Sequence, residues 1–458
     1  MPRPLSSQFF RPLRWRDVYT ETELYRAAVR VYTKPLFQWR KALCSSTDGK
    51  TLYDFASRGL RGLDELHAAL RREKFVFRPA LALHYNFNGK HRTLYIAPWE
   101  ERIVDLLLYR ALNRKLHAWF SPNSYAYRER GFGLDLCQSR LAQTLNPARG
   151  PLYLVKRDIA NYFASIDHQL LLDQLRTLLD YDDYVYRLVQ QRVQFWYEED
   201  AAVQQAKVGV PFGTAVACVL ANIYLTTLDR ELEAIPDLEF FRYADDILLA
   251  SRRRECAVLG SHTLDRVLSD LKLATKPSHS AAIVLAGISV QDSRFLPASH
   301  LRHLGLRFSH DAGISLARDK QRKIQNLFRF AFRRTRRRWS RLRDPRSRAE
   351  ALAAIANETI ARGVRNVAIV DYYLKHVNDE QQLRLLDRWL AEEVLSLIFG
   401  GHKKGNFRRL SFGELRNLGL PSLLHRHRLI LRGEIESPFF IWRKQRAQRA
   451  LGRTVARL

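Results

Sequence analysis

The residues best suited to chemistry are two adjacent aspartates, Asp245 and Asp246, within the segment 240–249 (FFRYADDILL). Apolar residues on both sides predict two strands joined by a tight turn that carries the acids. Adjacent carboxylates repel each other, and partial burial adds a desolvation cost, so the pair favours a bound cation. Magnesium suits this place because it takes one or two carboxylates together with water and substrate phosphates. For the pair alone, a solvated acidic loop is the alternative.

A third carboxylate, Asp158, ends an apolar run in the segment 153–168 (YLVKRDIANYFASIDH). Strand ends are where open sheets present catalytic groups. If this strand lies next to the turn, three carboxylates could hold two metal ions about 3.5–4 Å apart, one activating a hydroxyl and the other stabilising the leaving pyrophosphate. Phosphoryl transfer of this kind depends on positioning and charge neutralisation.

The order and separation of these two segments resemble the palm of bacterial reverse transcriptases. Residues 158–168 resemble the first aspartate motif of that family, and residues 243–246 (YADD) resemble the second. The resemblance implies an α+β right-hand polymerase fold and two Mg2+ ions, with Mn2+ as an alternative. The site residues that it implies are the catalytic, metal-binding Asp158, Asp245 and Asp246, the metal ligand Ile159, and the template or primer contact Tyr243.

By the same resemblance, Phe163 would be a steric gate, a ring under the sugar that rejects a 2′-OH and favours dNTPs. A ring that only fills the core is the alternative. Residues 207–215 (KVGVPFGTA) resemble the Pro-Gln-Gly segment of the family, but Phe212 stands where glutamine is usual. We expect Phe212 and Gly213 to contact the template. Our hypothesis is that the Phe212 ring stacks beside the templating base, since stacking tolerates any base.

Basic residues upstream of the palm resemble the fingers motifs of group II intron and retron-like enzymes. The first such motif contains Lys90, Arg92 and residues 96–98 (IAP), and the second is the segment 124–131 (SYAYRERG), which contains Arg128. Arg92 and Arg128 would both bind the incoming triphosphate, because a guanidinium is a bidentate ligand for anions. A solvated basic loop is the alternative for each.

Two downstream segments continue the family order. Residues 271–277 (LKLATKP) resemble the segment that carries a lysine near the triphosphate, which makes Lys276 a dNTP-binding candidate. Residues 303–308 (HLGLRF) resemble the primer-grip hairpin, in which Gly305 would let the backbone lie against the primer. For His425 and His427, in a basic segment without an acidic partner, contact with RNA or simple solvation is favoured over a metal site.

The composition fits a nucleic-acid partner. The chain has 458 residues, enough for two or three domains. Its 76 Lys and Arg against 47 Asp and Glu leave a formal charge of +29, and phosphates release counterions when they meet such a surface. A merely basic composition is the alternative.

Four widely spaced cysteines form no disulfide or zinc pattern, so a reducing cytosol and a cytoplasmic protein are expected. Prolines interrupt any targeting helix near the N-terminus, and no apolar run is long enough to span a membrane.

The surrounding elements divide into four expected parts. Helical periodicity is visible over 54–72 and 100–117, and the centre alternates strands at 152–156, 238–242 and 247–250 with helices at 168–179, 212–233 and 262–272. Beyond residue 307 the pattern is helical and rich in arginine. The first of these helices is expected to pack through Ile324, Leu327, Phe328 and Ala331 and to be basic on its other face. Later helices are expected to be capped by Asn378, with Gln381, and by Ser411, with Glu414. The expected domains are an N-terminal helical extension (1–80), fingers (81–150), palm (151–308), and a helical thumb and C-terminal nucleic-acid-binding region (309–458).

These observations predict a reverse transcriptase that adds dNTPs to DNA on an RNA template. The Phe212 departure and the large helical C-terminus resemble the defence-associated "unknown group" enzymes, which implies an antiphage role, a noncoding RNA partner and possible oligomers. The alternatives are a retron or group II intron maturase-type enzyme, and a catalytically silent nucleic-acid-binding scaffold. An RNA-dependent RNA polymerase is disfavoured by Phe163 and by Ala244 before the paired acids.

Overall fold

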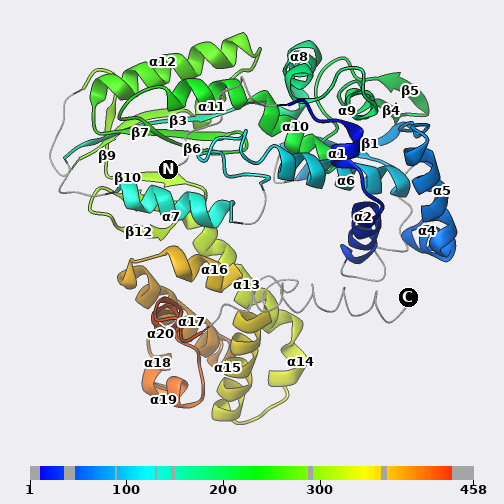
Figure 1. Ribbon diagram of the computed structural model, residues 1–458. Coiled ribbons are helices and arrows are strands. Elements are labelled where there is room, and N and C mark those ends of the chain that lie inside the picture. The colour runs from blue at the N-terminus through cyan, green and yellow to red at the C-terminus, as the bar shows by residue number, and fades with distance from the viewer. Residues whose placement is uncertain are drawn as a thin grey trace. The chain divides into compact units, whose positions relative to one another are not determined.

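A computed structural model describes residues 11–35, 47–87, 90–128, 131–145, 150–286, 292–362 and 369–435. Most of residues 1–15 that bear on targeting, and Cys44, lie outside this set. Helices and sheets are mixed along the chain, which confirms the expected α+β class. The chain forms two compact units, one made of residues 1–137, 152–284 and 291–296, the other of 138–151, 285–290 and 297–458. Figure 1 traces the elements of both.

The first unit contains the sheet that carries the aspartates. Its strand order is β6-β7-β3-β8-β9, and β6 pairs antiparallel with β7, which pairs antiparallel with β3. The strands are β6 (Glu239–Tyr243), β7 (Asp246–Ser251), β3 (Leu152–Asp158), β8 (Ala281–Leu285) and β9 (Leu296–Ala298), the last of which spans the boundary between the units. Helix α12 (Arg254–Asp270) packs against β3 and β7, as Figure 1 shows. The apolar runs of β3 and β7 are buried here because this helix covers them.

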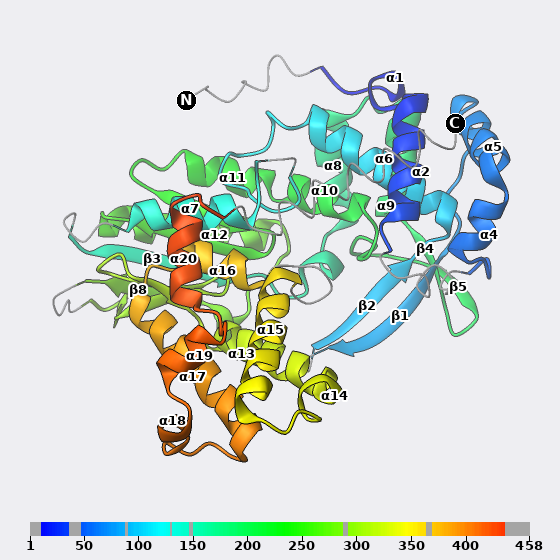
Figure 2. The ribbon, with the colours of Figure 1, turned by 90° about the horizontal axis from the view of Figure 1, so that it is seen from below.

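A second sheet of the first unit has the order β2-β1-β4-β5. Strands β1 (Ala80–Phe87) and β2 (Lys90–Ile96) form the long hairpin visible in Figure 2. The others are β4 (Trp196–Glu199) and β5 (Ala202–Gln205). The helices of this unit besides α12 are α1 (Trp15–Val18), α2 (Glu21–Thr33), α4 (Leu52–Ser57), α5 (Gly59–Arg71), α6 (Trp99–Lys115), η3 (Tyr162–Ala164), α8 (His168–Leu178), α9 (Tyr184–Val193), α10 (Val216–Tyr224), α11 (Thr226–Glu233) and η4 (Pro277–His279).

The second unit combines a small sheet with helices. Its sheet order is β10-β11-β12, formed by β10 (His300–His303), β11 (Leu306–Ser309) and β12 (Ile314–Leu316). The helices are α13 (Arg318–Arg334), α14 (Arg336–Trp339), α15 (Pro345–Arg362), α16 (Ile369–His376), α17 (Glu380–Phe399), α18 (Asn406–Arg409), α19 (Phe412–Asn417) and α20 (Leu423–Leu431), and α7 (Leu134–Thr144) begins in the first unit and ends in the second.

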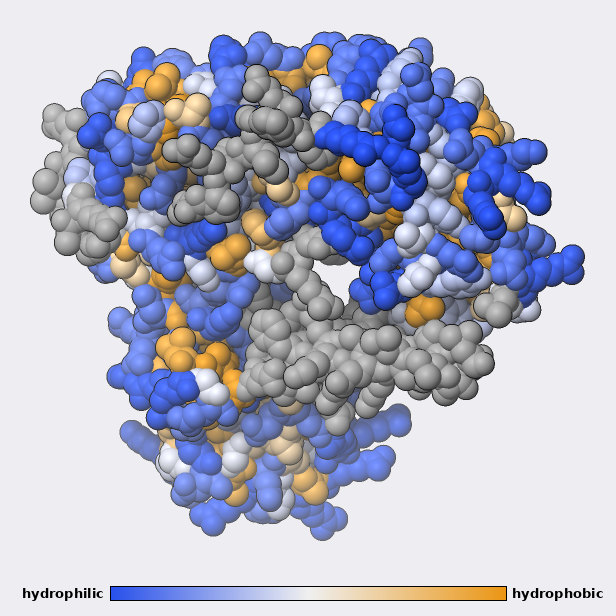
Figure 3. Space-filling view, in the orientation of Figure 1, coloured by the Kyte–Doolittle hydropathy of each residue, from blue (hydrophilic) through white to orange (hydrophobic). Residues whose placement is uncertain are grey.

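Helix α13 confirms the expected division into an apolar and a basic face. Ile324, Leu327 and Phe328 are buried on one side. The exposed basic residues of α13 are Arg318, Arg322, Lys323, Arg333 and Arg334. The side of the molecule drawn in Figure 3 is mostly hydrophilic, in keeping with the charged composition. Among the described residues, no helix combines the length and apolar character that a membrane span requires.

Several expected helix boundaries were wrong. The helix expected at 262–272 begins at Arg254, because its N-cap, Arg253, offers no side-chain cap that a sequence could reveal. The helix expected over 212–233 is two helices that meet at Leu225. The segment 54–72 also divides, at Gly59, whose φ of +58° lies outside helical geometry.

Helix caps in the second unit were predicted with mixed success. Ser411 and Glu414 form the predicted capping box. Asn378 was expected to cap α17, but Asp379 does so by accepting a hydrogen bond from the Gln382 amide. The Asn378 side chain instead accepts from the Ile314 backbone N–H at 2.6 Å, which satisfies a donor on β12. The cap prediction was therefore off by one residue.

The units also differ from the expected domain limits. The expected extension, residues 81–137 of the expected fingers and most of the expected palm fall in the first unit. Residues 138–150 and the hairpin of β10 and β11, which was expected in the palm, fall in the second. A sequence pattern predicts helices and strands but not which of them pack together. It therefore could not predict that the second unit resumes at residue 297.

Candidate active site

A two-residue turn joins β6 to β7 and presents the paired aspartates. Tyr243 pairs with Asp246 across the strands, which leaves Ala244 and Asp245 as the loop. Ala244 has φ +59°, and Asp245 is not in this left-handed region, the pattern of a type II′ turn. That turn favours glycine at the first position, so alanine here carries backbone strain.

The third aspartate lies directly opposite the second. Strand β3 pairs with β7 so that Asp158 faces Asp246, and the Ile159 amide donates to the Asp245 carbonyl at 3.1 Å. Strand register therefore brings Asp158, Asp245 and Asp246 to one corner of the sheet, as the sequence predicted.

The corner is negatively charged and partly shielded from water. Burial raises the pKa of Asp245, and the neighbouring charges of Asp158 and Asp246 raise it further, against a lowering by Lys276. The Lys276 ammonium donates to Asp158, and its backbone N–H donates to the Asp158 carbonyl at 2.8 Å. Lys156 forms an ion pair with Asp246 at 3.5 Å. The expected dNTP ligand Lys276 thus lies at the carboxylates.

The donor set fits a hard divalent ion that also binds phosphate. Within the described ranges, no three acidic, histidine or cysteine side chains converge closely enough to hold a metal ion by themselves. Magnesium does not require such a cage, because it keeps several waters and uses one or two carboxylates plus substrate phosphates. Carboxylates of Asp158, Asp245 and Asp246 are the groups available at this corner, and the Ile159 backbone adjoins them through its amide.

A buried ion pair fixes strand β6 just before the turn. Arg242 donates to both oxygens of Asp229, at 2.7 and 2.5 Å, and both side chains are fully buried. A third Arg242 bond goes to the Asn222 side-chain oxygen at 3.2 Å. Sequence reasoning missed this network, although an arginine between Phe241 and Tyr243 in an apolar strand is a signal for it. The pair ties β6 to α10 and α11.

The segment after Asn123 adds a short bridge to the other edge of β6. The Arg242 amide donates to the Asn123 carbonyl and the Tyr125 amide to the Arg242 carbonyl, both at 2.9 Å. This pairing places Tyr127 near the turn. Burial raises the pKa of Tyr127, and the neighbouring Cys218 and Asp245 raise it further.

Arg128, an expected triphosphate ligand, is engaged within its own segment. Its guanidinium donates to the backbone carbonyls of Ser121, Ser124 and His117, at 2.7, 3.1 and 2.9 Å. The side chain is buried, and burial lowers its pKa to about 10. Arg128 therefore stabilises the turn of its own segment, and its role as a triphosphate ligand stays a prediction. Arg92, by contrast, is exposed on β2.

The expected gate and the unusual phenylalanine are neighbours. Phe163 is half-buried in η3, and its ring centroid lies 5.0 Å from that of Phe212. Tyr127 meets Phe163 edge-on at 6.1 Å. The Arg92 guanidinium carbon lies 6.0 Å from the centre of the Phe212 ring. Gly213 has φ +112°, a conformation that favours glycine.

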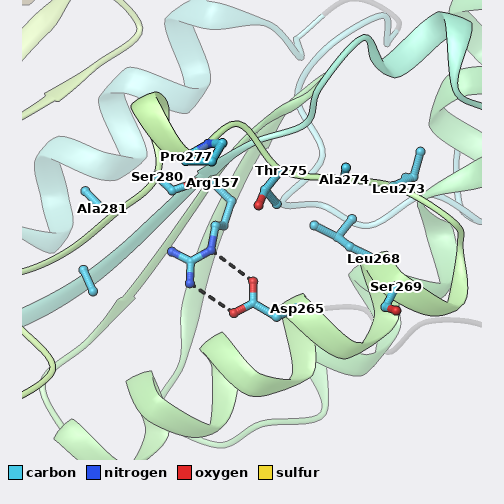
Figure 4. A pocket seen from close by; sticks show the side chains of 11 residues that line it. Arg157, Asp265, Leu268, Ser269, Leu273, Ala274, Thr275, Pro277, Ser280 and Ala281 are labelled. Carbon is cyan, nitrogen blue, oxygen red and sulfur yellow. Dashed lines mark hydrogen bonds and ion pairs between the residues drawn. The ribbon is translucent and has the colours of Figure 1, made fainter.

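A cavity of about 580 Å3 lies beside the strand that carries Asp158. Figure 4 shows Arg157, the residue before Asp158, paired with Asp265 inside it, at 3.0 and 3.1 Å. Thr275 and Pro277, which flank Lys276, also line it. The cavity therefore adjoins the backbone that positions Asp158 and Lys276.

Two further predicted residues lie in the second unit. Gly305 has φ +90° in the turn between β10 and β11, where an added Cβ would lie 2.5 Å from the Lys320 side chain. His427 is buried on α20, and its ring lies 2.6 Å from the Leu374 carbonyl. Among the described residues it belongs to no cluster that could hold a metal ion. The expectation of solvation or RNA contact was wrong for His427, while His425 is exposed.

Comparison with known proteins gives a family match over the same region. Residues 88–308 match the family model "Reverse transcriptase (RNA-dependent DNA polymerase)". The chain is 24% identical over 191 residues to the "Putative COX1/OXI3 intron 1 protein" of Saccharomyces cerevisiae, covering 41% of this chain and 22% of that protein. It is 27% identical over 172 residues to the "Uncharacterized 91 kDa protein in cob intron" of Schizosaccharomyces pombe, covering 37% and 21%.

The aligned part thus spans about a fifth of the length of these curated relatives. Among solved structures, an apo telomerase from Candida tropicalis, truncated from its C-terminal domain, aligns with a TM-score of 0.41 and 11% identity over 56% of this chain and 60% of that one. The family match encloses all three aspartates, Phe163 and Phe212. Residues 88–308 are therefore similar in sequence to a reverse transcriptase domain.

Proposed function

We propose that this protein is an RNA-directed DNA polymerase whose centre is the corner formed by Asp158, Asp245 and Asp246. The observation that carries the proposal is the register of β3 and β7, which sets Asp158 opposite Asp246 inside a domain of the reverse transcriptase family. A scaffold has no reason to keep crowded acids at a cost in stability, so the shifted pKa of Asp245 favours a functional site.

In this proposal the three aspartates and the Ile159 carbonyl would hold two divalent ions, Mg2+ or Mn2+. When bound, such ions would supply activation of the attacking 3′-hydroxyl and stabilisation of the leaving pyrophosphate. The protein supplies position and charge: the turn at Ala244 fixes Asp245, and the pairing of β3 fixes Asp158.

Substrate binding falls to the groups around the corner. Arg92 and Lys276 are cationic and lie at the Phe212 ring and at Asp158, respectively, so both can meet a triphosphate. Phe163 excludes the 2′-hydroxyl and selects dNTPs. Gly213 and Tyr243 lie on the template or primer side, and Phe212 is considered separately below.

The nucleic-acid partners are an RNA template and the DNA product. The formal charge of +29 and the exposed arginines of α13 favour contact with phosphates in the second unit, and Gly305 is the primer-side candidate there. We further propose a cytoplasmic role in antiphage defence with a noncoding RNA as template, on the resemblance of the sequence to that class.

A second candidate function is action in intron mobility. It is favoured by the two relatives reported above, both of which are named as intron proteins. A neighbouring gene for a structured intron RNA would support this candidate, and a neighbourhood of defence genes would oppose it.

The test is nucleotide incorporation by the purified full chain with a defined RNA template and DNA primer, in magnesium, with labelled dNTPs or rNTPs. We expect dNTP incorporation that disappears in the double variant Asp245→Ala/Asp246→Ala. Sequencing the product made with co-purifying RNA then identifies the natural template. No incorporation from either nucleotide set, with any RNA supplied, would overturn the proposal in favour of the silent scaffold.

A further inference from the structure

Phe212 contacts the gate ring rather than standing apart from it. The Phe163 and Phe212 centroids are 5.0 Å apart with the ring planes tilted by 57°. This separation is within the range in which aromatic pairs attract each other. Phe212 is also the position at which the chain departs from the family pattern, so its role is specific to this sequence.

Both rings rest on backbone that is held by hydrogen bonds. The Val210 amide donates to the Phe163 carbonyl at 2.8 Å, and the Tyr95 amide donates to the Phe212 carbonyl at 2.9 Å. Gly209 permits the close approach of the two segments, because a Cβ there would lie 3.0 Å from the Phe163 carbonyl oxygen. These bonds fix the backbone of Phe163 relative to residues 209–210 and the backbone of Phe212 relative to Tyr95. The backbone on each side of the ring pair is therefore held in place.

A steric gate discriminates only if its ring cannot turn away from the sugar. A half-exposed phenylalanine changes rotamer readily unless its neighbours prevent it. Tyr127 and Tyr162 contact the Phe163 ring at 6.1 and 5.7 Å, and Phe212 is the nearest of the three. Removing the Phe212 ring would open space into which the gate could move.

The contacts of Phe212 argue against its stacking on a template base. Phe163 lies at 5.0 Å, and the Arg92 guanidinium carbon lies 6.0 Å from the same ring. These two contacts occupy part of the surface of the Phe212 ring within the protein, which leaves less of it for a base. The Phe212 ring thus joins a candidate triphosphate ligand to the candidate sugar gate.

We propose that Phe212 is a positioning residue that holds the Phe163 ring against the sugar, so that selection of dNTPs over rNTPs depends on residue 212. This inference rests on the proposed polymerase function. It assigns Phe212 to sugar selection, in place of the template-base stacking that the sequence first suggested.

The test compares kcat/KM for dGTP and GTP opposite a template C, using the full chain, an RNA template, a DNA primer and magnesium. The variants are Phe212→Leu, Phe212→Ala and Phe212→Gln, with Phe163→Ala and Phe163→Ala/Phe212→Ala completing a double-mutant cycle. Phe212→Leu keeps most of the buried volume, so it remains informative where the smaller side chains lower the folded fraction, which thermal unfolding reports.

We expect Phe212→Leu and Phe212→Ala to lower the preference for dGTP about tenfold, mainly through a lower KM for GTP. Phe212→Ala should add little when Phe163 is already alanine, because the effect acts through that ring. The error rate opposite each template base should not change.

Tyr181→Ala is a matched control, since Tyr181 and Tyr186 form a pair of similar geometry, 4.9 Å and 57°, outside the carboxylate corner. It should leave the preference unaltered. An unchanged preference in Phe212→Leu and Phe212→Ala, a further loss of preference in the double variant, or a change confined to base errors would overturn the inference. Absence of incorporation by the unmodified chain would instead overturn the proposed function, and this inference with it.

Discussion

Asp229 and Asp245 both lie beside strand β6, and their surroundings carry opposite charge. Asp229 meets Arg242 in a fully buried bidentate pair, with a further bond from Arg242 to Asn222. Asp245 meets two more acids, and its pKa is raised by burial and by those neighbours. Arg242, which neutralises Asp229, therefore lies only three positions before Asp245, where negative charge is concentrated.

The difference separates structure from function. The Asp229–Arg242 pair has its charges and hydrogen bonds matched inside the protein, so it needs no ligand. The carboxylate corner has three acids and two partly exposed lysines, Lys156 and Lys276, which offset the negative charge incompletely. In the proposed function, matched charge holds β6 in place so that the mismatched charge at its end can meet a cation and a substrate.

The largest expected effect follows loss of Asp158. Asp158→Ala removes a ligand of the proposed metal ions, whose stabilisation of the transition state amounts to several kcal/mol, so we expect incorporation to fall by about a thousandfold or more. Single-turnover incorporation measures this. Asp265→Ala is the control, because Asp265 pairs with the adjacent Arg157 and not with the corner. Equal losses in both variants would mean that the damage spreads through β3 rather than through the metal site.

Breaking the matched pair should act on stability. Asp229→Asn leaves Arg242 buried without its counter-charge, so we expect the free energy of unfolding to fall by about 3–5 kcal/mol. Denaturant unfolding measures it. Asp237→Asn is the control, because it breaks the exposed Arg253–Asp237 pair at the start of the same hairpin, and we expect it to cost at most about 1 kcal/mol. A similar cost for both would contradict the distinction drawn here.

Lys276 tests whether a neutralising lysine also binds substrate. Lys276→Met removes a charge-assisted contact, so we expect the KM for dNTP to rise about tenfold with a smaller change in kcat. Lys276→Arg should retain most of the affinity. If the dNTP KM is unchanged and the magnesium concentration for half-maximal activity falls instead, Lys276 serves only as a counter-charge to Asp158.

The smallest effect concerns the strained turn. Ala244→Gly relieves a φ of +59° that alanine adopts at a cost, so we expect a gain of up to about 1 kcal/mol in the free energy of unfolding. Incorporation should stay within a factor of about two, because the aspartates keep their register. A loss of stability would show that packing of the buried methyl group outweighs the strain.

The three aspartates could be predicted from the sequence because adjacent acids between apolar strands, and a third acid at the end of another strand, are local patterns. The strands themselves were also predicted to within two residues. Phe163 and Phe212 were selected as candidates, but their contact with each other depends on Gly209 and on tertiary packing, which no local pattern contains.

Arg128 shows the limit of motif resemblance. The sequence gives a basic residue among tyrosines, and a triphosphate ligand is one interpretation of it. In the structure its guanidinium donates hydrogen bonds to three backbone carbonyls. A sequence does not show which backbone carbonyls of a turn need a hydrogen-bond donor. Similarly, the buried Asp229–Arg242 pair joins residues on separate elements, so its partners could not be assigned in advance.

The most direct measurement follows synthesis and stability together in Asp245→Asn. The folded-state pKa of Asp245 lies above its ordinary value of 3.8, so above that pH the ionised carboxylate opposes folding, and the neutral amide removes this cost. The account predicts that the variant loses incorporation yet unfolds at the same or a higher temperature at pH 7, with the difference shrinking as the pH falls towards 4. Retained incorporation, or a loss of synthesis that parallels a loss of stability, would contradict the claim that these carboxylates form the centre of a polymerase.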